Sequence, residues 1–384
     1  MKFRSIVILV LVVVLLGSLG TAGFLYYQQR VEQRNLNRLE QATVQLENGD
    51  TQTAIQLLLP LVQQGKRFQE ADEALYQLAR AYQQGGHAEA LELWQRLAEN
   101  YPQSPYVNEA LLQQARLVAE DDPEKAQAIY REIQDAGDPL IQGQALLGMA
   151  QQYEDRGNID QAREVYYQIL ETDTSAEIIS QAKDRLSEIN TQLLWSPTLD
   201  EFSQLYTVKP GDVPIEIGAQ FGVPSYYVLE ANNIQGALRP GKRLKVPKEP
   251  FKVTVDKEAC RLELLTESGR FIKWYPVGVG QQSYKTPAGV YTIENKQIDP
   301  TWYRPTGGVI PPGDPENALG TRWMGIGSSL GIHGTNEPDT IGYRESAGCI
   351  RMYNEDAEEL FKLLTLGSKV IIEEESNEEP TTPS

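Results

Sequence analysis

The C-terminal third of the chain is built around the segment "GIHGTNEPDTIGYRESAGCIRM", residues 331–352. It contains Cys349, one of two cysteines in the sequence, and His333, one of two histidines, sixteen positions apart. A free thiol is mostly protonated at neutral pH, so a nucleophilic cysteine needs a base or a cation beside it. Gly334 and Gly348 adjoin the two residues and let the backbone approach a substrate closely. The segment therefore predicts a cysteine nucleophile paired with a histidine base.

The residues around this segment are typical of a β-sheet domain. "FKVTVD", "RLELL", "RFIKWYPVGVG" and "VYTIEN" alternate apolar and polar side chains and are separated by glycine and proline turns. One late helix is expected, with Asn354 as its N-cap and Gly367 ending it before the strand "KVIIEE". The sequence thus predicts a mainly-β domain over residues 250–373.

Four stretches in this domain, "TPAGVYTI", "LGTRWMGI", "GIHGTNEPDTIGYRESAGCIRMYNEDAEELF" and "GSKVII", resemble the L,D-transpeptidase (YkuD-type) family across nearly its whole length. The resemblance implies that Cys349 is the nucleophile and His333 its base. One departure is Ala347, which stands where many members carry a histidine.

Further site residues follow from the same alignment of motifs. Gly348 and its neighbours would supply backbone N–H groups to an oxyanion, and Gly334 or Thr335 would orient the imidazole. Ser346 and Arg351 fall on family positions, where binding a substrate and bracing the loop remain open as alternatives.

The reaction implied is acyl transfer. The cysteine would form an acyl-enzyme with a peptidoglycan tetrapeptide stem, release D-Ala, and pass the acyl group to an amine, either for cross-linking or for protein attachment. Two alternatives stay open: an L,D-carboxypeptidase, in which water attacks the same thioester, and a non-catalytic wall-binding scaffold. No cofactor and no metal are implied, because no second histidine lies near the site.

The charge state of the pair is a separate expectation. A thiolate facing an imidazolium would lower the pKa of the Cys349 thiol and raise the pKa of the His333 imidazole, since each charge favours the other. Cys260 has no histidine near it in sequence and is expected to be structural, with a disulfide to Cys349 as the alternative.

A long segment between Asn295 and Trp323 is rich in proline and glycine, which is typical of a lid or a binding loop. Trp302 and Tyr303 favour order over disorder, because disordered segments are poor in aromatic residues. We expect this segment to form a substrate-binding flap over Cys349.

Residues 206–247 form a second module. A strand at 206–208, a helix begun by Pro214, a second helix after Val223 and a closing strand at 244–246 predict a small β-α-α-β unit. "YTVKPGD", "FGV", "LEANNI" and "LRPGKRLKVP" resemble the LysM family, which places this domain at 205–248.

The LysM resemblance implies binding of N-acetylglucosamine chains such as peptidoglycan. The expected groove lies between the loop at Gly211 and Asp212 and the loop formed by Asn232, Asn233 and Ile234. For Asp212 and Asn232, roles as cap or turn residues remain open beside the glycan role.

Residues 40–190 are rich in Ala, Leu, Gln and Glu, which is a helical composition, and they carry a repeat. Four alanines fall 36 positions apart, each followed four positions later by a large residue: Ala54 and Leu58, Ala90 and Trp94, Ala126 and Tyr130, Ala162 and Tyr166. The pattern resembles tetratricopeptide repeats, an all-α solenoid. The inner surface of such an array is expected to bind a protein partner, and the alternative is that the array is a spacer that holds the rest of the chain away from the membrane.

The N-terminus contains "IVILVLVVVLLGSLGTAGFLYY", residues 6–27, an uncharged run long enough to span a bilayer. Lys2 and Arg4 precede it, so residues 1–27 predict a single-pass membrane anchor with everything after residue 28 on the extracytoplasmic side of the cell envelope. A cleaved signal peptide is the alternative.

A net charge of −18 argues against a nucleic-acid partner, and residues 374–384 read as a solvated acidic tail. The chain is therefore expected to be a multidomain α and β protein: a transmembrane helix, a helical-repeat solenoid, a βααβ module and a mainly-β catalytic domain.

Overall fold

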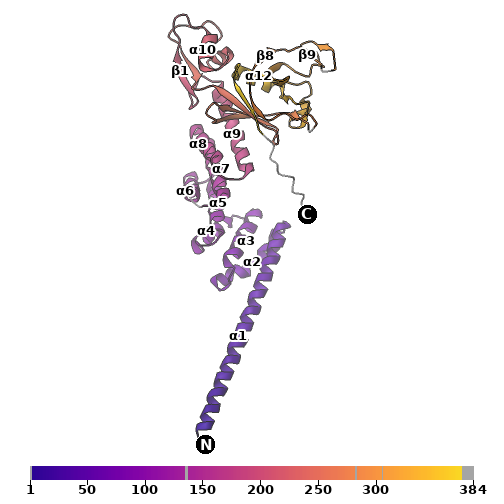
Figure 1. Cartoon of the computed structure of the whole chain (residues 1–384). Helices are drawn as coiled ribbons and strands as arrows, with labels where there is room; N and C mark the ends of the chain where they lie inside the picture. Colours follow the sequence, from indigo (N-terminus) through magenta and orange to yellow (C-terminus); the bar gives the residue numbers. More distant parts are fainter. Residues whose placement is uncertain (1, 135–136, 282, 305, 374–384) are drawn as a thin grey trace. The chain divides into compact units, whose positions relative to one another are not determined.

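The structure is a computed structural model of the chain, and it describes residues 2–134, 137–281, 283–304 and 306–373 (Figure 1). The side chains of residues 2–20 and 22 are also outside the description. The expected acidic tail at 374–384 lies outside the described residues. The chain divides into two compact units, residues 1–179 and 180–384, which are treated separately below.

The first unit opens with one long helix, α1 (Lys2–Glu47). Among the residues that the structure describes, no helix is both long and apolar enough to cross a membrane. The expected anchor covers residues 1–27, most of whose side chains are outside the description. The anchor therefore stays a prediction.

The remaining helices of the first unit follow one another, and each packs on the next along the chain. They are α2 (Thr51–Gln64), the 3-10 turn η1 (Gly65–Arg67), α3 (Ala71–Gln84), α4 (Ala90–Asn100), α5 (Val107–Val118), α6 (Pro123–Gln134), α7 (Pro139–Asp155) and α8 (Ile159–Leu170). The four alanines of the repeat lie on α2, α4, α6 and α8 and are at most 2% exposed. Alanine lets two helices approach closely, which explains why it is buried at these positions. Because the alanines recur on every second helix, the 36-residue period predicted from sequence is the period of the helix pairs.

The second unit begins within α9 (Ala176–Leu194), which the repeat boundary at residue 190 had assigned to the solenoid. The small module follows as β1 (Ser203–Thr207), α10 (Pro214–Phe221), α11 (Ser225–Glu230) and β2 (Arg243–Pro247). The β-α-α-β order is as predicted. Its first strand starts earlier than expected, because β1 and β2 pair antiparallel from Ser203 opposite Pro247.

The C-terminal part of this unit is mainly β, as predicted. One sheet has the order β5-β4-β3-β15-β7, from β3 (Phe251–Asp256), β4 (Arg261–Thr266), β5 (Phe271–Pro276), β7 (Gly289–Thr292) and β15 (Lys369–Ile372). A second sheet has the order β14-β12-β11-β8, from β8 (Asn295–Ile298), β11 (Arg322–Gly327), β12 (Leu330–His333) and β14 (Ile350–Arg351). Two separate two-stranded sheets pair β6 (Val279–Gly280) with β13 (Arg344–Ser346), and β9 (Trp302–Tyr303) with β10 (Val309–Ile310). A 3-10 turn, η2, covers Pro338–Thr340.

Helix α12 (Asn354–Leu363) packs against β11 and β12. Its expected cap is wrong: Tyr353 occupies the N-cap position, and the Asn354 side chain bonds other loops instead. The helix also ends at Leu363 rather than at Gly367, because the residue after it, Leu364, is already extended. Gly367 lies in the following turn, with a φ of +84°.

Helix α9 covers the free edge of the first sheet. Ser187 accepts a hydrogen bond from the Trp274 backbone N–H (3.2 Å), and Asn190 donates to the carbonyl oxygen of Ile272 (2.8 Å). The Trp274 indole donates to Asp184 (2.8 Å). An edge strand exposes unpaired backbone groups, so these side chains of α9 complete β5 in place of a further strand.

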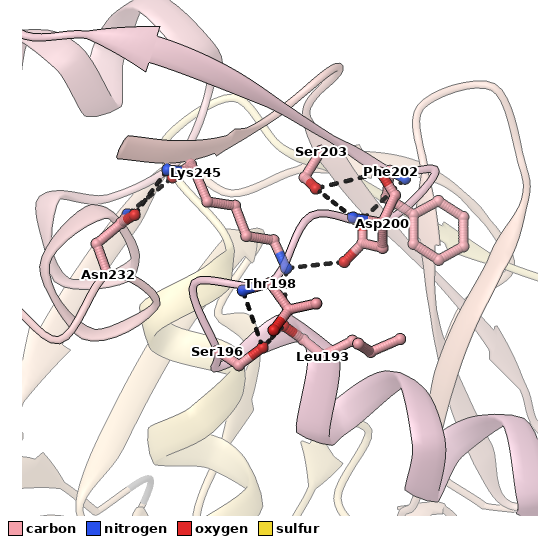
Figure 2. A network of polar contacts seen from close by, with 8 residues as sticks. All are labelled: Leu193, Ser196, Thr198, Asp200, Phe202, Ser203, Asn232 and Lys245. Atoms are coloured by element: carbon pink, nitrogen blue, oxygen red, sulfur yellow. Dashed lines mark hydrogen bonds and ion pairs between the residues drawn. The ribbon is translucent and has the colours of Figure 1, made fainter. Parts of the chain in front are cut away.

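A buried ion pair joins the small module to α9 and to the linker after it (Figure 2). Lys245 Nζ lies 2.8 Å from Asp200 Oδ2 and donates to the carbonyl oxygen of Leu193 at 2.7 Å. The side chains of Lys245 and Asp200 are 1% and 5% exposed. One continuous apolar core also runs from Tyr227 of the module to Phe251 of the sheet. The module and the β domain therefore pack as one unit.

Candidate active site

Cys349 lies in a tight turn between β13 and β14. The turn needs Gly348, whose φ of +113° is a backbone conformation that side chains disfavour. Cys349 is a half-buried free thiol, and its Sγ is 3.7 Å from the carbonyl oxygen of Ser329. The residue is thus held by the ends of two strands, with its sulfur partly accessible.

His333 is the last residue of β12, which pairs in parallel with β14 so that His333 lies opposite Arg351. The imidazole is only 4% exposed. Its Nδ1 is 2.6 Å from the carbonyl oxygen of Gly334. Because a carbonyl oxygen only accepts, Nδ1 carries the proton and Nε2 is left as the basic nitrogen.

Trp323 covers the imidazole. Its ring stacks on His333 with centroids 5.7 Å apart and planes inclined by 26°, and its indole donates to Asn295 (2.9 Å). Gly331 makes this possible, since a Cβ there would lie 2.6 Å from the Trp323 ring. The tryptophan shields His333 from water.

The resulting pKa values run opposite to the ion-pair expectation. Burial lowers the pKa of His333 to about 4, against a smaller raising effect of its bond to Gly334. Burial also raises the pKa of the Cys349 thiol above its usual range, partly offset by a hydrogen bond from Gly331 and by the charge of Arg351. At neutral pH the pair is therefore a thiol and a neutral imidazole, because both sit where charge is poorly solvated.

Cys349 and His333 open into one pocket of about 690 Å³. Trp302 and Tyr303, from β9, line it together with Trp323 and Arg351. The segment before β11 contains the short strands β8, β9 and β10, of which Figure 1 labels β8 and β9. Asn317 is only 3% exposed, and it donates to the carbonyl oxygens of Pro300 (2.8 Å) and Pro311 (3.1 Å). These two bonds hold together parts of the segment that lie on either side of β9 and β10.

Ser346 braces the cysteine turn. Its hydroxyl donates to the carbonyl oxygen of Cys349 (2.6 Å) and accepts the N–H of Gly348 (3.1 Å), and the side chain is 1% exposed. The Gly348 N–H is therefore occupied, contrary to the oxyanion role expected for it. Within the described residues, the N–H of Cys349 has no hydrogen-bond acceptor.

The Arg351 side chain contacts both the η2 turn and the pocket. Its Nη1 donates to Glu337 (3.0 Å) and to Thr340 (3.4 Å), which braces the η2 turn. The same side chain lines the pocket beside Cys349. Among the described residues its other guanidinium nitrogens have no partner, so they remain available to a ligand carboxylate.

Comparison with known proteins identifies the domain. Residues 250–372 match the family model of the L,D-transpeptidase catalytic domain, YkuD. The putative L,D-transpeptidase YkuD of Bacillus subtilis is 33% identical to 44% of this chain, and the match covers 97% of that protein. The chain belongs to the L,D-transpeptidase family. The probable L,D-transpeptidase ErfK/SrfK of Escherichia coli is 32% identical over 47% of this chain and 66% of its own length.

Among solved structures, the catalytic domain of an E. faecium L,D-transpeptidase is 24% identical and covers 32% of this chain and 96% of its own, with a TM-score of 0.28. Upstream of the L,D-transpeptidase domain, residues 73–104 and 144–173 match a tetratricopeptide repeat, and residues 206–247 match the LysM domain. The order of the three predicted domain types is thereby confirmed.

Cys260 is not one of the described residues that line the pocket of Cys349 and His333. It is 6% exposed, and its Sγ contacts the carbonyl oxygen of Lys257 at 3.7 Å. Burial raises the pKa of its thiol. Both cysteines of the chain are free, so the alternative of a disulfide is not what the structure contains.

The orienting role expected of Gly334 or Thr335 belongs to the Gly334 carbonyl. Thr335 instead gives its N–H to Asn354 (3.2 Å) and accepts from the same amide through its carbonyl oxygen (2.9 Å). Asn354 also accepts the N–H of Thr321 (3.1 Å). This asparagine, which the sequence suggested only as a helix cap, ties the His333 loop of the transpeptidase domain to α12 and β11.

The predicted glycan-binding residues of the LysM module lie in different environments. Asp212 accepts from the Tyr206 hydroxyl (2.6 Å) and the Lys209 N–H (2.8 Å), which closes the first loop. Asn232 is buried, and among the described residues its side chain bonds Val228 and Lys245. The predicted residues Gly211 and Asn233 are exposed with positive φ, and Ile234 packs partly into the core.

Proposed function

We propose that this L,D-transpeptidase acts through Cys349 as a nucleophile on a peptidoglycan tetrapeptide stem. The thiol attacks the carbonyl that joins the L-centre of the diamino acid to the terminal D-Ala, and D-Ala leaves. An amine then attacks the thioester and forms a cross-link or attaches a protein. The observation that carries this proposal is that Cys349 lines the same pocket as His333, whose Nδ1 is occupied by the Gly334 carbonyl oxygen.

Proton transfer accompanies attack rather than preceding it. His333 is neutral above about pH 4, so Nε2 takes the thiol proton as the S–C bond forms. The imidazolium that results is stabilised by its Nδ1–H bond to Gly334 and passes the proton to the leaving amine of D-Ala. The acceptor amine later returns a proton through the same ring, which restores the thiol.

Two groups would bind the substrate around this step. The N–H of Cys349, which has no acceptor among the described residues, would donate to the oxyanion of the tetrahedral intermediate, a contact of the kind that typically stabilises such states by about 3 kcal/mol. Arg351 would hold a carboxylate of the stem with the nitrogens that do not bind Glu337. Trp302 and Tyr303 would cover the bound stem from the β9 side of the pocket.

The upstream modules would place the enzyme. LysM and L,D-transpeptidase domains both imply peptidoglycan binding. We assign the chain to the cell envelope, with residues after 28 outside the cytoplasm, on the strength of that substrate and of the uncharged run at 6–27. The repeats would offer a surface to a protein partner. The test of this placement is to add a protease to the outside of the cytoplasmic membrane and to measure whether it cleaves the repeats.

The main alternative is an L,D-carboxypeptidase, in which water replaces the amine. The two reactions share one thioester, so product analysis separates them. The full chain should be incubated with a disaccharide-tetrapeptide, with and without an acceptor stem, and the products weighed. A cross-linked dimer formed only with the acceptor supports transfer, and a disaccharide-tripeptide as the sole product would establish hydrolysis.

A further inference from the structure

The turn that carries Cys349 rests on a buried threonine from a distant part of the chain. Thr286 lies between β6 and β7 and is 2% exposed. Its hydroxyl donates to the carbonyl oxygen of Gly348 (2.9 Å) and accepts the N–H of Gly280 (2.8 Å). The one hydroxyl proton is therefore committed to the peptide that precedes the nucleophile.

The direction of that peptide decides where the Cys349 N–H points. In a trans peptide the carbonyl and the following N–H point in opposite directions, and the described chain has no cis peptide bond. With the Gly348 carbonyl aimed at Thr286, the Cys349 N–H must point away from it. Ser346 holds the Gly348 N–H and the Cys349 carbonyl, so the Cys349 N–H is the one polar backbone group of these two described residues without a partner.

We infer that Thr286 is a positioning residue, which orients the Gly348–Cys349 peptide so that the Cys349 N–H meets the oxyanion. The inference rests on the proposed function. The backbone of Thr286 is also held in place, because the buried Lys257 ammonium donates to the Thr286 carbonyl oxygen at 3.3 Å. Gly280 allows the close approach, since a Cβ there would lie 2.5 Å from the Thr286 nitrogen.

This role differs from simple structural support in what it changes. Losing the Thr286 hydroxyl frees the Gly348 carbonyl to rotate, which turns the Cys349 N–H away from its target and weakens only the steps that generate an oxyanion. Alkylation of the thiol by iodoacetamide is a direct displacement with no oxyanion. A positioning role therefore predicts that acyl transfer and alkylation respond differently to the same substitution.

The test compares Thr286→Val, Thr286→Ser and Thr266→Val in the full chain. Valine keeps the shape of threonine and removes the hydroxyl, and serine restores it. Thr266, the last residue of β4, is the matched control, because it is also buried (1% exposed) and its hydroxyl is hydrogen-bonded to Ser268 and Arg270 in the turn after β4. Three rates are measured: D-Ala release from the tetrapeptide, p-nitrophenolate release from p-nitrophenyl acetate, and iodoacetamide labelling of Cys349.

We expect Thr286→Val to lower kcat for D-Ala release and for the ester about 10- to 100-fold, with KM and the iodoacetamide rate within about threefold of wild type. Serine should recover most of kcat, and Thr266→Val should leave all three rates unchanged. An unchanged kcat in Thr286→Val, or an equal fall in alkylation, overturns the inference. A wild-type chain that reacts with the ester and not with the stem refutes the proposed function, while the ester rates still decide the role of Thr286.

Discussion

Nδ1 of His333 donates to the carbonyl oxygen of the next residue, Gly334, across 2.6 Å. This bond fixes the tautomer of the ring and reserves Nε2 for the thiol proton of Cys349. Removing the ring should therefore abolish base catalysis while leaving the nucleophile in place.

His333→Gln should lower the rate of D-Ala release at pH 7 by about 10²- to 10⁴-fold, the range expected for loss of a general base. His87→Gln is the matched control, because His87 is exposed in the turn before α4 of the repeats and should leave the rate unchanged. A His333→Gln chain with near-wild-type turnover would show that another group accepts the proton.

The pH dependence of thiol labelling should reveal a neutral pair. Because burial raises the pKa of Cys349, the iodoacetamide rate should rise with a midpoint above that of a free thiol, about 8.5. Arg351→Gln removes a cation that favours the thiolate, so it should move the midpoint further upward. The measurement uses Cys260→Ser, which leaves Cys349 as the only thiol. A midpoint below about 8 would restore the thiolate–imidazolium pair.

Acyl transfer should also keep an acid limb set by the ring. Above a pH of about 4 the imidazole is neutral and can accept a proton, and below it the charged ring cannot. The kcat/KM for D-Ala release should therefore hold from neutral pH down to about pH 5 and fall below that. A limb centred near 6.5, the value of a solvated histidine, would contradict the dry environment under Trp323.

The buried pair of Lys245 and Asp200 should matter for stability more than surface pairs do. Lys245→Met leaves a buried carboxylate without its partner and should cost about 3–5 kcal/mol, whereas the double variant with Asp200→Leu should recover most of it. Lys362→Met breaks an exposed pair with Glu230 and should cost less than about 1 kcal/mol.

Urea unfolding followed by tryptophan fluorescence measures this difference, since four of the five tryptophans belong to the second unit. Equal midpoints for Lys245→Met and Lys362→Met would show that the network in Figure 2 does not hold the LysM module in place.

Two neighbouring asparagines of the LysM module should behave differently. Asn232→Ala removes the buried hydrogen bonds that its amide makes to the N–H and the carbonyl oxygen of Lys245, at about 1 kcal/mol for each bond, so the module should lose stability. Asn233→Gly keeps the positive φ of 53° and removes an exposed amide. It should weaken binding to isolated peptidoglycan in a sedimentation assay without changing the melting temperature. Unchanged binding would remove Asn233 from the glycan site.

Local patterns predicted much of this molecule. The 36-residue spacing identified α2, α4, α6 and α8 because helix packing repeats along the chain, and Cys349 and His333 were found because so few residues of their types exist. The contacts that position the site residues could not be predicted from sequence, because they join residues far apart along the chain. Thr286 meets Gly348 from 62 positions away, and Asn354 reaches Thr321 from 33 positions away.

The predicted charge state of Cys349 and His333 was wrong for a related reason. From sequence, a thiol beside a histidine favours an ion pair, because each charge stabilises the other. The cover supplied by Trp323 and the paired strands β12 and β14 creates a desolvation cost that opposes both charges. Burial at this site is a property of tertiary packing, and no motif in the segment 331–352 encodes it.

The central claim is that Cys349 carries the acyl group, and the direct measurement is a mass map of the trapped enzyme. The full chain is mixed with disaccharide-tetrapeptide without acceptor, quenched in acid and digested. The account predicts the mass of the stem less D-Ala on the peptide that contains Cys349, present in Cys260→Ala and absent in Cys349→Ala. D-Ala release with no adduct on Cys349, or an adduct on Cys260 in the wild-type chain, would contradict it.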